Sequence, residues 1–137
     1  MVGGLQSNKI NEAISLFTCI HSVDRHKILE GINKNITEDS SLKEVFIQVN
    51  ISNEASKGGI EVSEVDDFLG GAKKYGNINI LGLMTMPPPN EEPSVYFALL
   101  NIYFDYPNFD KYFFIYINRV RNMIRIFLYN IFNSNFF

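Results

Sequence analysis

The chain has 137 residues, of which 46% are hydrophobic and 20% are charged, and its formal net charge is −3. This size and composition favour one globular domain with its own hydrophobic core and exclude a disordered chain. The acidic balance argues against a general affinity for nucleic acid or for anionic membranes, so we expect neither as a partner.

The single cysteine, Cys19, excludes an internal disulfide. The first residues lack the basic and apolar stretches of a signal peptide. We therefore expect a cytoplasmic protein. A mitochondrial location would follow if a segment preceding Met1 carried a targeting signal.

Hydrophobic periodicity predicts that strands and helices alternate along the first half of the chain. Residues 1–5 form a short apolar run that predicts a strand, and apolar residues recur at helical spacing over 10–17. A second short strand is predicted over 18–23. Asp24 is then expected to cap a helix whose apolar face includes Ile28 and Ile32.

The same alternation continues to residue 93. Residues 45–51 are rich in β-branched side chains and predict a buried strand, which a polar loop follows. A helix is expected to begin after Ile60 and to end before Gly76. Residues 78–84 predict a fourth strand, the prolines at 87–89 a rigid connection, and Pro93 the first turn of another helix.

Four strands that alternate with helices through short loops are typical of a parallel α/β sheet, because each parallel crossover needs a helix to return. Periodicity leaves an open sheet and a barrel as alternatives, since both bury their strands on two faces. Four βα units are half of an eight-stranded barrel. Because the first predicted strand begins at residue 1, with no polar segment before it, we expect that the front of the domain is missing from this chain.

The end of the chain differs from the rest in composition. Of the 19 Phe and Tyr residues, 15 lie in the last 42 positions, and residues 96–137 carry a net charge of +2 against −5 for residues 1–95. We therefore divide the chain into a domain, 1–105, and an aromatic helical or irregular tail, 106–137. The tail's composition fits translation of A/T-rich DNA outside the true frame. Its central arginines and asparagines argue against a membrane span.

Functional residues of parallel α/β proteins gather at the carboxyl ends of the strands. Side chains alternate between the two faces of a strand, so alternate residues at the ends of the third and fourth predicted strands would line the mouth of a barrel. The positions that these rules select are Gln6, Asn8, His21, Gln48, Asn50, Ser52, Lys57, Gly82, Met84 and Met86.

Taken one at a time, these residues have ordinary structural roles. His21 has no second ligand at metal spacing, so we predict no metal site. Cys19 fits an inert packed thiol, Lys57 a solvated loop lysine, and the methionines Met84 and Met86 core packing. No nucleophile with its base and no pair of catalytic carboxylates is apparent, so we expect no enzyme activity.

Five segments together, in this order and spacing, resemble the pyridoxal phosphate homeostasis protein family. They are Val-Gly-Gly-Leu-Gln-Ser-Asn-Lys at 2–9, His-Ser-Val-Asp-Arg at 21–25, Gln-Val-Asn-Ile-Ser at 48–52, Ser-Lys-x-Gly at 56–59 and Gly-Leu-Met-Thr-Met-Pro at 82–87. The family resembles the amino-terminal barrel of alanine racemase. Over residues 1–104 the resemblance implies a partial (β/α)8 TIM-type barrel that binds pyridoxal 5′-phosphate and serves vitamin B6 homeostasis.

The resemblance also implies which residues contact the cofactor. Lys57 corresponds to the position from which the racemase barrel directs a cation at the phenolic oxygen of the cofactor. The resemblance implies that Lys57 favours the phenolate form of the cofactor and, if the lysine pKa is lowered, could accept the aldehyde as a Schiff base. Asn50 takes the matching inward strand position, Met86 flanks the pyridine ring, and Met84 shares its face. Gln6 and Asn8 belong to the family signature.

Two parts of the family pattern are missing. The Schiff-base lysine of the family lies before the Gly-x-Leu-Gln segment, and its Gly-Met-Ser-x-Asp and Arg-x-Gly segments do not follow here. We therefore expect an incomplete, monomeric chain with impaired cofactor binding. The alternatives are a non-functional fragment or mispredicted gene model, and a racemase-like enzyme acting on amino acids.

Overall fold

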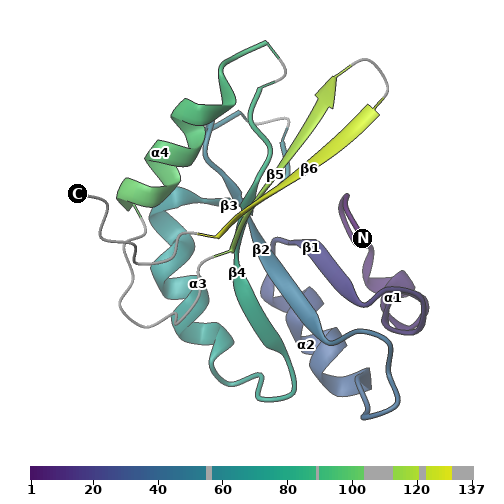
Figure 1. The fold of residues 1–137 in the computed structure, drawn as a ribbon. Coiled ribbons are helices and arrows are strands. Elements are labelled where there is room, and N and C mark those ends of the chain that lie inside the picture. The colour runs from purple at the N-terminus through teal and green to yellow at the C-terminus, as the bar shows by residue number, and fades with distance from the viewer. Residues whose placement is uncertain (55–56, 89, 104–112, 121–122, 131–137) are drawn as a thin grey trace.

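The computed structural model describes residues 1–54, 57–88, 90–103, 113–120 and 123–130 of the chain. Strands and helices alternate along it (Figure 1). The helical elements are η1 (Ser7–Lys9), α1 (Ile10–Leu16), α2 (His26–Asn35), η2 (Val62–Glu64), α3 (Val65–Ala72) and α4 (Pro93–Tyr103). The strands are β1 (Cys19–Val23), β2 (Glu44–Asn50), β3 (Ile60–Glu61), β4 (Asn79–Thr85), β5 (Phe113–Val120) and β6 (Met123–Asn130).

β2 lies at the centre of the parallel part of the sheet. It pairs with β1 on one side and with β4 on the other, and the short β3 pairs with its last two residues. The sheet order β1-β2-β4-β5-β6 follows the chain order. The carboxyl ends of β1, β2 and β4 therefore meet at one edge of the sheet, as the sequence predicts.

The main core lies on one face of this sheet, beneath the helices. Alternate residues of β2 pack there against apolar residues of α1, α2 and α3 and against Leu100 of α4. The β2 residues are Val45, Ile47 and Val49; the helix residues include Ile10, Ala13, Ile14, Ile28, Leu29, Ile32, Val65, Phe68, Leu69 and Ala72. The helical periodicity of these segments is thereby confirmed.

The opposite face carries a smaller cluster to which no helix among the described residues contributes. Phe46 and Met84 are its buried members, and Val2, Cys19 and Met86 pack against them. Among the described residues, the helices α1 to α4 thus contribute to the same core and leave the other face of β2 and β4 to strand residues and the first residues of the chain.

The expected strand at residues 1–5 is wrong. Its backbone pairs with β1 at Met1, whose amino group donates to the Cys19 carbonyl at 2.6 Å and whose carbonyl accepts from the His21 N–H at 2.9 Å, and the Ser22 hydroxyl donates to the Gly3 carbonyl. Gly3 then takes a positive φ of 110°, which turns the backbone out of an extended ladder. The first of the four predicted βα units therefore consists of a helix preceded by an irregular segment.

The expected cap of α2 is also wrong. Arg25, in an extended conformation, occupies the N-cap position, and no side chain caps the helix. The Asp24 carboxylate instead pairs with the Arg25 guanidinium at 3.2 Å, and that guanidinium donates to the Leu5 carbonyl at 2.8 Å. An aspartate next to a helix start predicts a cap from sequence alone, but a nearby arginine competes for its oxygens.

The prediction of a helical or irregular tail is wrong for two segments. Residues 113–120 and 123–130 form the antiparallel pair β5 and β6, and β5 lies parallel to β4. Aromatic and β-branched residues favour a pleated strand, and β4 offers β5 an unpaired edge. The expected domain boundary at 105/106 lies outside the described residues. In the described part of the chain, no helix is both long and apolar enough to span a membrane.

Truncating the core beneath β2 should destabilise the fold. Leu29 on α2 is fully buried in the main core, so L29A should lower the free energy of unfolding by about 2–5 kcal/mol. Urea unfolding monitored by circular dichroism measures this. The matched control is K27A on the exposed side of the same helix, where a change within about 0.5 kcal/mol is expected. Equal effects of the two changes would contradict the assigned helix face.

Candidate functional site

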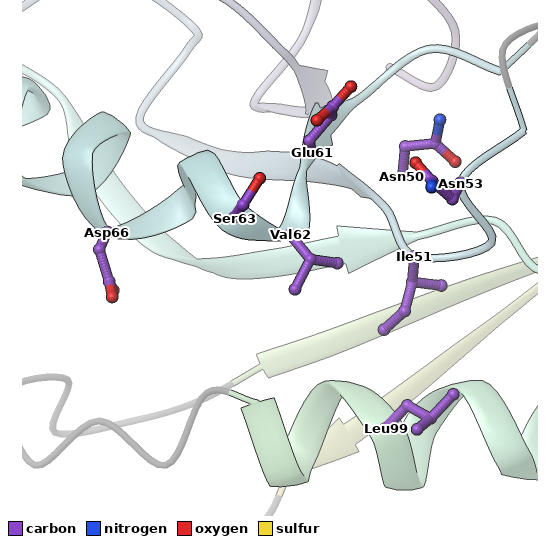
Figure 2. A pocket seen from close by; sticks show the side chains of 8 residues that line it. All are labelled: Asn50, Ile51, Asn53, Glu61, Val62, Ser63, Asp66 and Leu99. Atoms are coloured by element: carbon purple, nitrogen blue, oxygen red, sulfur yellow. The ribbon is translucent and has the colours of Figure 1, made fainter.

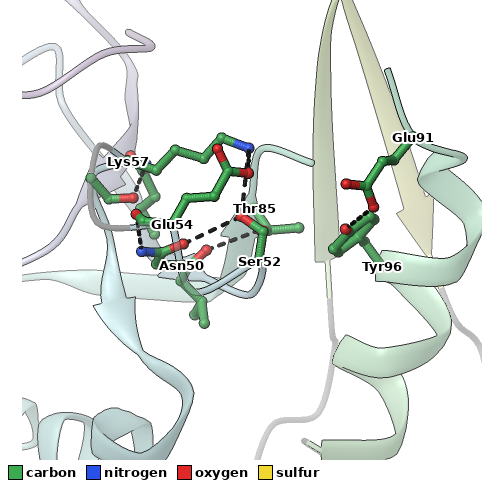
Figure 3. A network of polar contacts seen from close by, with 10 residues as sticks. Asn50, Ser52, Glu54, Lys57, Thr85, Glu91 and Tyr96 are labelled. Atoms are coloured by element: carbon green, nitrogen blue, oxygen red, sulfur yellow. Dashed lines mark hydrogen bonds and ion pairs between the residues drawn. The ribbon is translucent and has the colours of Figure 1, made fainter. Parts of the chain in front are cut away.

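The candidate site lies where β2 ends and the chain turns back through residues 51–59. Asn50 is the last residue of β2, and its amide donates to the Glu54 carbonyl at 2.9 Å. The Lys57 N–H donates to the same carbonyl at 3.0 Å. One backbone oxygen therefore ties together two of the residues that the sequence selects (Figure 3).

The Lys57 side chain lies back over this turn. Its Nζ is 2.6 Å from Glu54 Oε1 and 3.5 Å from Ser52 Oγ, and the side chain is only 20% exposed. The structure thus places Lys57 as a largely covered ammonium close to the end of β2, whereas position in a loop alone predicts a solvated lysine. The ion pair lowers the pKa of Glu54, chiefly through the hydrogen bond from Lys57, so Glu54 is a carboxylate at neutral pH.

Gly59 explains how the loop returns to β2. Its φ is +122°, and a Cβ atom built on it would lie 2.7 Å from the Asn50 backbone nitrogen. Just before it, the Gln48 amide donates to the Gly58 carbonyl at 2.8 Å. Only glycine allows this approach without strain, which gives the Ser-Lys-x-Gly segment its physical basis and fixes the position of Lys57.

Of the two methionines of the candidate site, Met84 lies on the neighbouring strand β4 and Met86 directly follows that strand. Met84 pairs in register with Gln48, so the two residues lie side by side on β4 and β2. Met84 has no exposed surface and packs beside Phe46, whereas Met86 is half-buried. A ligand at this edge can therefore touch Met86 directly, and it reaches Met84 only if a neighbouring side chain moves.

Gln6 and Asn8 lie apart from this network. Both are exposed around η1, and Gln6 precedes that turn and accepts a hydrogen bond from the Lys9 N–H at 3.0 Å. No hydrogen bond or ion pair within the described ranges joins either residue to residues 50–57. The structure thus gives these two signature residues no role at the lysine-bearing loop.

His21 and Cys19 lie on the face of the sheet that carries the cluster around Phe46 and Met84. The ring of His21 meets that of Phe46 edge-on at 5.3 Å, and burial together with the nearby amino terminus lowers its pKa. Burial, reinforced by Glu44, raises the pKa of the Cys19 thiol to about 11, so the thiol is protonated at neutral pH. In the part of the chain that the structure describes, no three His, Cys, Asp or Glu side chains gather as a metal site.

A separate cavity of about 610 Å³ lies between the end of β2, the start of α3 and α4 (Figure 2). Asn50 is the one candidate residue that lines it, and Glu61, Asp66 and Leu99 line its other walls. Its two carboxylates would repel an anionic ligand. This cavity therefore fits the cofactor implied by the sequence less well than the Lys57 loop does.

Sequence reasoning missed two polar contacts of the site. The first is the ion pair between Glu54 and Lys57. The only sign of it in the sequence is that these two opposite charges lie three residues apart. Thr85, at the end of β4, donates to the Val49 carbonyl at 2.9 Å and is buried. Nothing in the local pattern distinguishes Thr85 from an ordinary strand residue, because its partner lies on another strand.

The fold and this loop together define a parallel α/β protein with a candidate small-molecule site at the carboxyl ends of its strands. Among solved structures, the chain is similar to PipY of Synechococcus elongatus without PLP, with a TM-score of 0.62 and 29% identity over 73% of this chain and 46% of that one. It is equally similar in fold to an unknown protein from Bifidobacterium adolescentis, with a TM-score of 0.62 and 28% identity, over 74% of this chain and 42% of that one.

The curated relatives that the chain resembles share one name. The chain is 34% identical over 92 residues to the pyridoxal phosphate homeostasis protein of Aquifex aeolicus, covering 67% of this chain and 40% of that protein. It is also 34% identical over 91 residues to the Escherichia coli K12 protein of the same name, covering 66% and 39%. No protein-family model matches the chain. The chain spans about two fifths of the length of these relatives, and over the matched part it is similar to the pyridoxal phosphate homeostasis proteins.

Substituting Gly59 should disrupt the lysine-bearing loop. G59A adds a Cβ 2.7 Å from the Asn50 nitrogen at a φ of +122°, which should cost about 2 kcal/mol of stability. Urea unfolding checks this. The adjacent G58A is the control, because its Cβ would meet nothing closer than 3.6 Å. If G59A were as stable as G58A, the loop would not close on β2 as described.

Cys19 should react slowly with thiol reagents in the native protein. Its rate of reaction with an aromatic disulfide should keep rising through pH 10, because the native pKa is about 11, whereas the urea-unfolded chain should level off around its ordinary value of 9.0. The measurement is an absorbance assay across pH, and the chain's single cysteine makes it specific. Superimposable pH profiles for the two states would contradict the burial of this thiol.

Proposed function

We propose that the chain binds pyridoxal 5′-phosphate reversibly at the carboxyl ends of β2 and β4 and takes part in intracellular vitamin B6 homeostasis without catalysing a reaction. The observation that carries the proposal is the covered Lys57 ammonium beside Asn50. The names of the curated relatives support it, as does a structure of PipY with PLP bound that shares this fold at a TM-score of 0.56.

The residues at this edge fit the chemistry of the cofactor. Pyridoxal phosphate combines anionic phenolate and phosphate oxygens with a flat ring and supplies a reactive aldehyde when bound. Lys57 offers an ammonium to an anionic oxygen, and Asn50 and Ser52 offer an amide and a hydroxyl. The half-buried Met86 offers an apolar, polarisable surface to the ring, with Met84 beneath it.

We propose that the sheet is part of a (β/α)8-type barrel. Successive parallel strands lie side by side in chain order, so right-handed crossovers place every helix on the same face. A doubly wound sheet reverses its strand order and has helices on both faces. The one-sided main core of this chain supports the barrel, whose interior would be the face that carries Phe46 and Met84.

A binding role is favoured over a racemase-like enzyme. Racemisation requires acid/base groups on both faces of the cofactor. Within the described ranges, the ends of β2 and β4 present Asn50, Met84 and Met86, which carry no such group, and Lys57 is neutralised by Glu54. The expectations of a monomer, of a cytoplasmic location and of no nucleic-acid or membrane partner are part of the same proposal.

Removing the lysine should weaken cofactor binding. An absorbance titration of the purified chain with pyridoxal phosphate should show saturable binding, and K57Q should raise the Kd at least about tenfold, since it removes a charge-assisted hydrogen bond. The control is K34Q, which removes a lysine from an exposed ion pair on α2 and should leave the Kd unchanged.

Borohydride treatment with peptide mapping gives a second readout of the same site. Labelling concentrated on Lys57 would place the aldehyde next to this loop. Scattered labelling of surface lysines, or equal affinities of K57Q and the unmodified chain, would show that the site is not at Lys57. No binding by the unmodified chain would favour the non-functional fragment.

A further inference from the structure

The Glu54–Lys57 ion pair differs from the other lysine pairs that the structure describes. Lys57 is 20% exposed and Glu54 40%, whereas Lys34 and Glu30 on α2 are 68% and 53% exposed. Both pairs have close contacts, at 2.6 and 2.7 Å. They therefore have matched chemistry, and only the first is partly shielded from water and from dissolved ions.

The turn that positions Lys57 also positions Glu54. The backbone carbonyl of Glu54 accepts hydrogen bonds from the Asn50 amide and from the Lys57 N–H. The hydrogen bonds from Lys57 and Ser52 both lower the pKa of Glu54. At neutral pH the lysine thus has a built-in anionic partner on the same turn.

A second polar contact lies on α4. Tyr96 donates a hydrogen bond to Glu91, and Figure 3 shows this pair as a contact separate from the network around Lys57. The charge of Glu54 also contributes to raising the pKa of Tyr96, after Glu91 and burial. Because Glu54 already contacts the Lys57 ammonium at 2.6 Å, an anionic ligand that approaches Lys57 must replace a carboxylate.

We propose that Glu54 acts as an internal competitor for Lys57: in the ligand-free chain its carboxylate occupies and shields the ammonium, and an anionic ligand binds by displacing it. The inference rests on the proposed function and adds a positioning residue that sets how tightly the site holds its ligand. Because the competitor is covalently part of the loop, its effective concentration is high and release of the ligand is favoured.

The test uses E54Q, with E30Q as the matched control. The first readout needs no cofactor: the rate at which each lysine reacts with trinitrobenzenesulfonate, mapped by mass spectrometry. In the unmodified chain Lys57 should react more slowly than Lys34. E54Q should speed the reaction of Lys57 several-fold, whereas E30Q should change that of Lys34 less than twofold. Circular dichroism of each variant shows that it folds.

The second readout is the affinity for pyridoxal phosphate. E54Q should lower the Kd about tenfold and E30Q should leave it unchanged. If Lys57 in the unmodified chain reacts as fast as Lys34, or if E54Q does not speed its reaction, the inference is overturned whatever happens to the affinity. A faster reaction with binding no tighter than that of the unmodified chain overturns the competition. A faster reaction in a chain that does not bind the cofactor supports the shielding and overturns only the proposed function.

Discussion

The described part of the fold depends on the burial of β2 between two parallel neighbours. β1, β3 and β4 all pair with this one strand, and its alternate side chains divide between the main core and the smaller cluster around Phe46 and Met84. A strand buried on both faces has a strongly specified register, because a slip of one residue would exchange its two faces. The edge at which the candidate residues meet is therefore set by the packing of β2.

The candidate site is a direct extension of that strand. Asn50 ends β2, residues 51–59 leave it and return, and the glycine at position 59 lets the returning backbone approach β2 closely enough for β3 to pair. Lys57 thereby becomes a covered ammonium next to a carboxylate of its own loop. The proposed binding of an anionic cofactor and its proposed weakening by Glu54 both depend on this closed turn.

Sequence periodicity identified the helices and the three longer parallel strands to within a few residues, because each buries a regular apolar stripe. It failed at residues 1–5, where five apolar or small residues fit a strand but the positive φ of Gly3 interrupts the backbone pairing with β1. It also failed at 113–120 and 123–130, where composition alone could not show that β4 has a free edge for β5. Both errors concern pairing between strands, which local sequence does not encode.

The sequence by itself determined the alternation of elements, the family resemblance and the choice of Asn50, Lys57, Met84 and Met86, since motifs and apolar spacing are properties of neighbouring positions. The tertiary structure alone decided which of these residues are accessible: it buries Met84, leaves Gln6 and Asn8 outside the loop network and pairs Lys57 with Glu54. The physical reason is that exposure and charge pairing depend on what packs against a side chain, and most of those atoms come from distant parts of the chain.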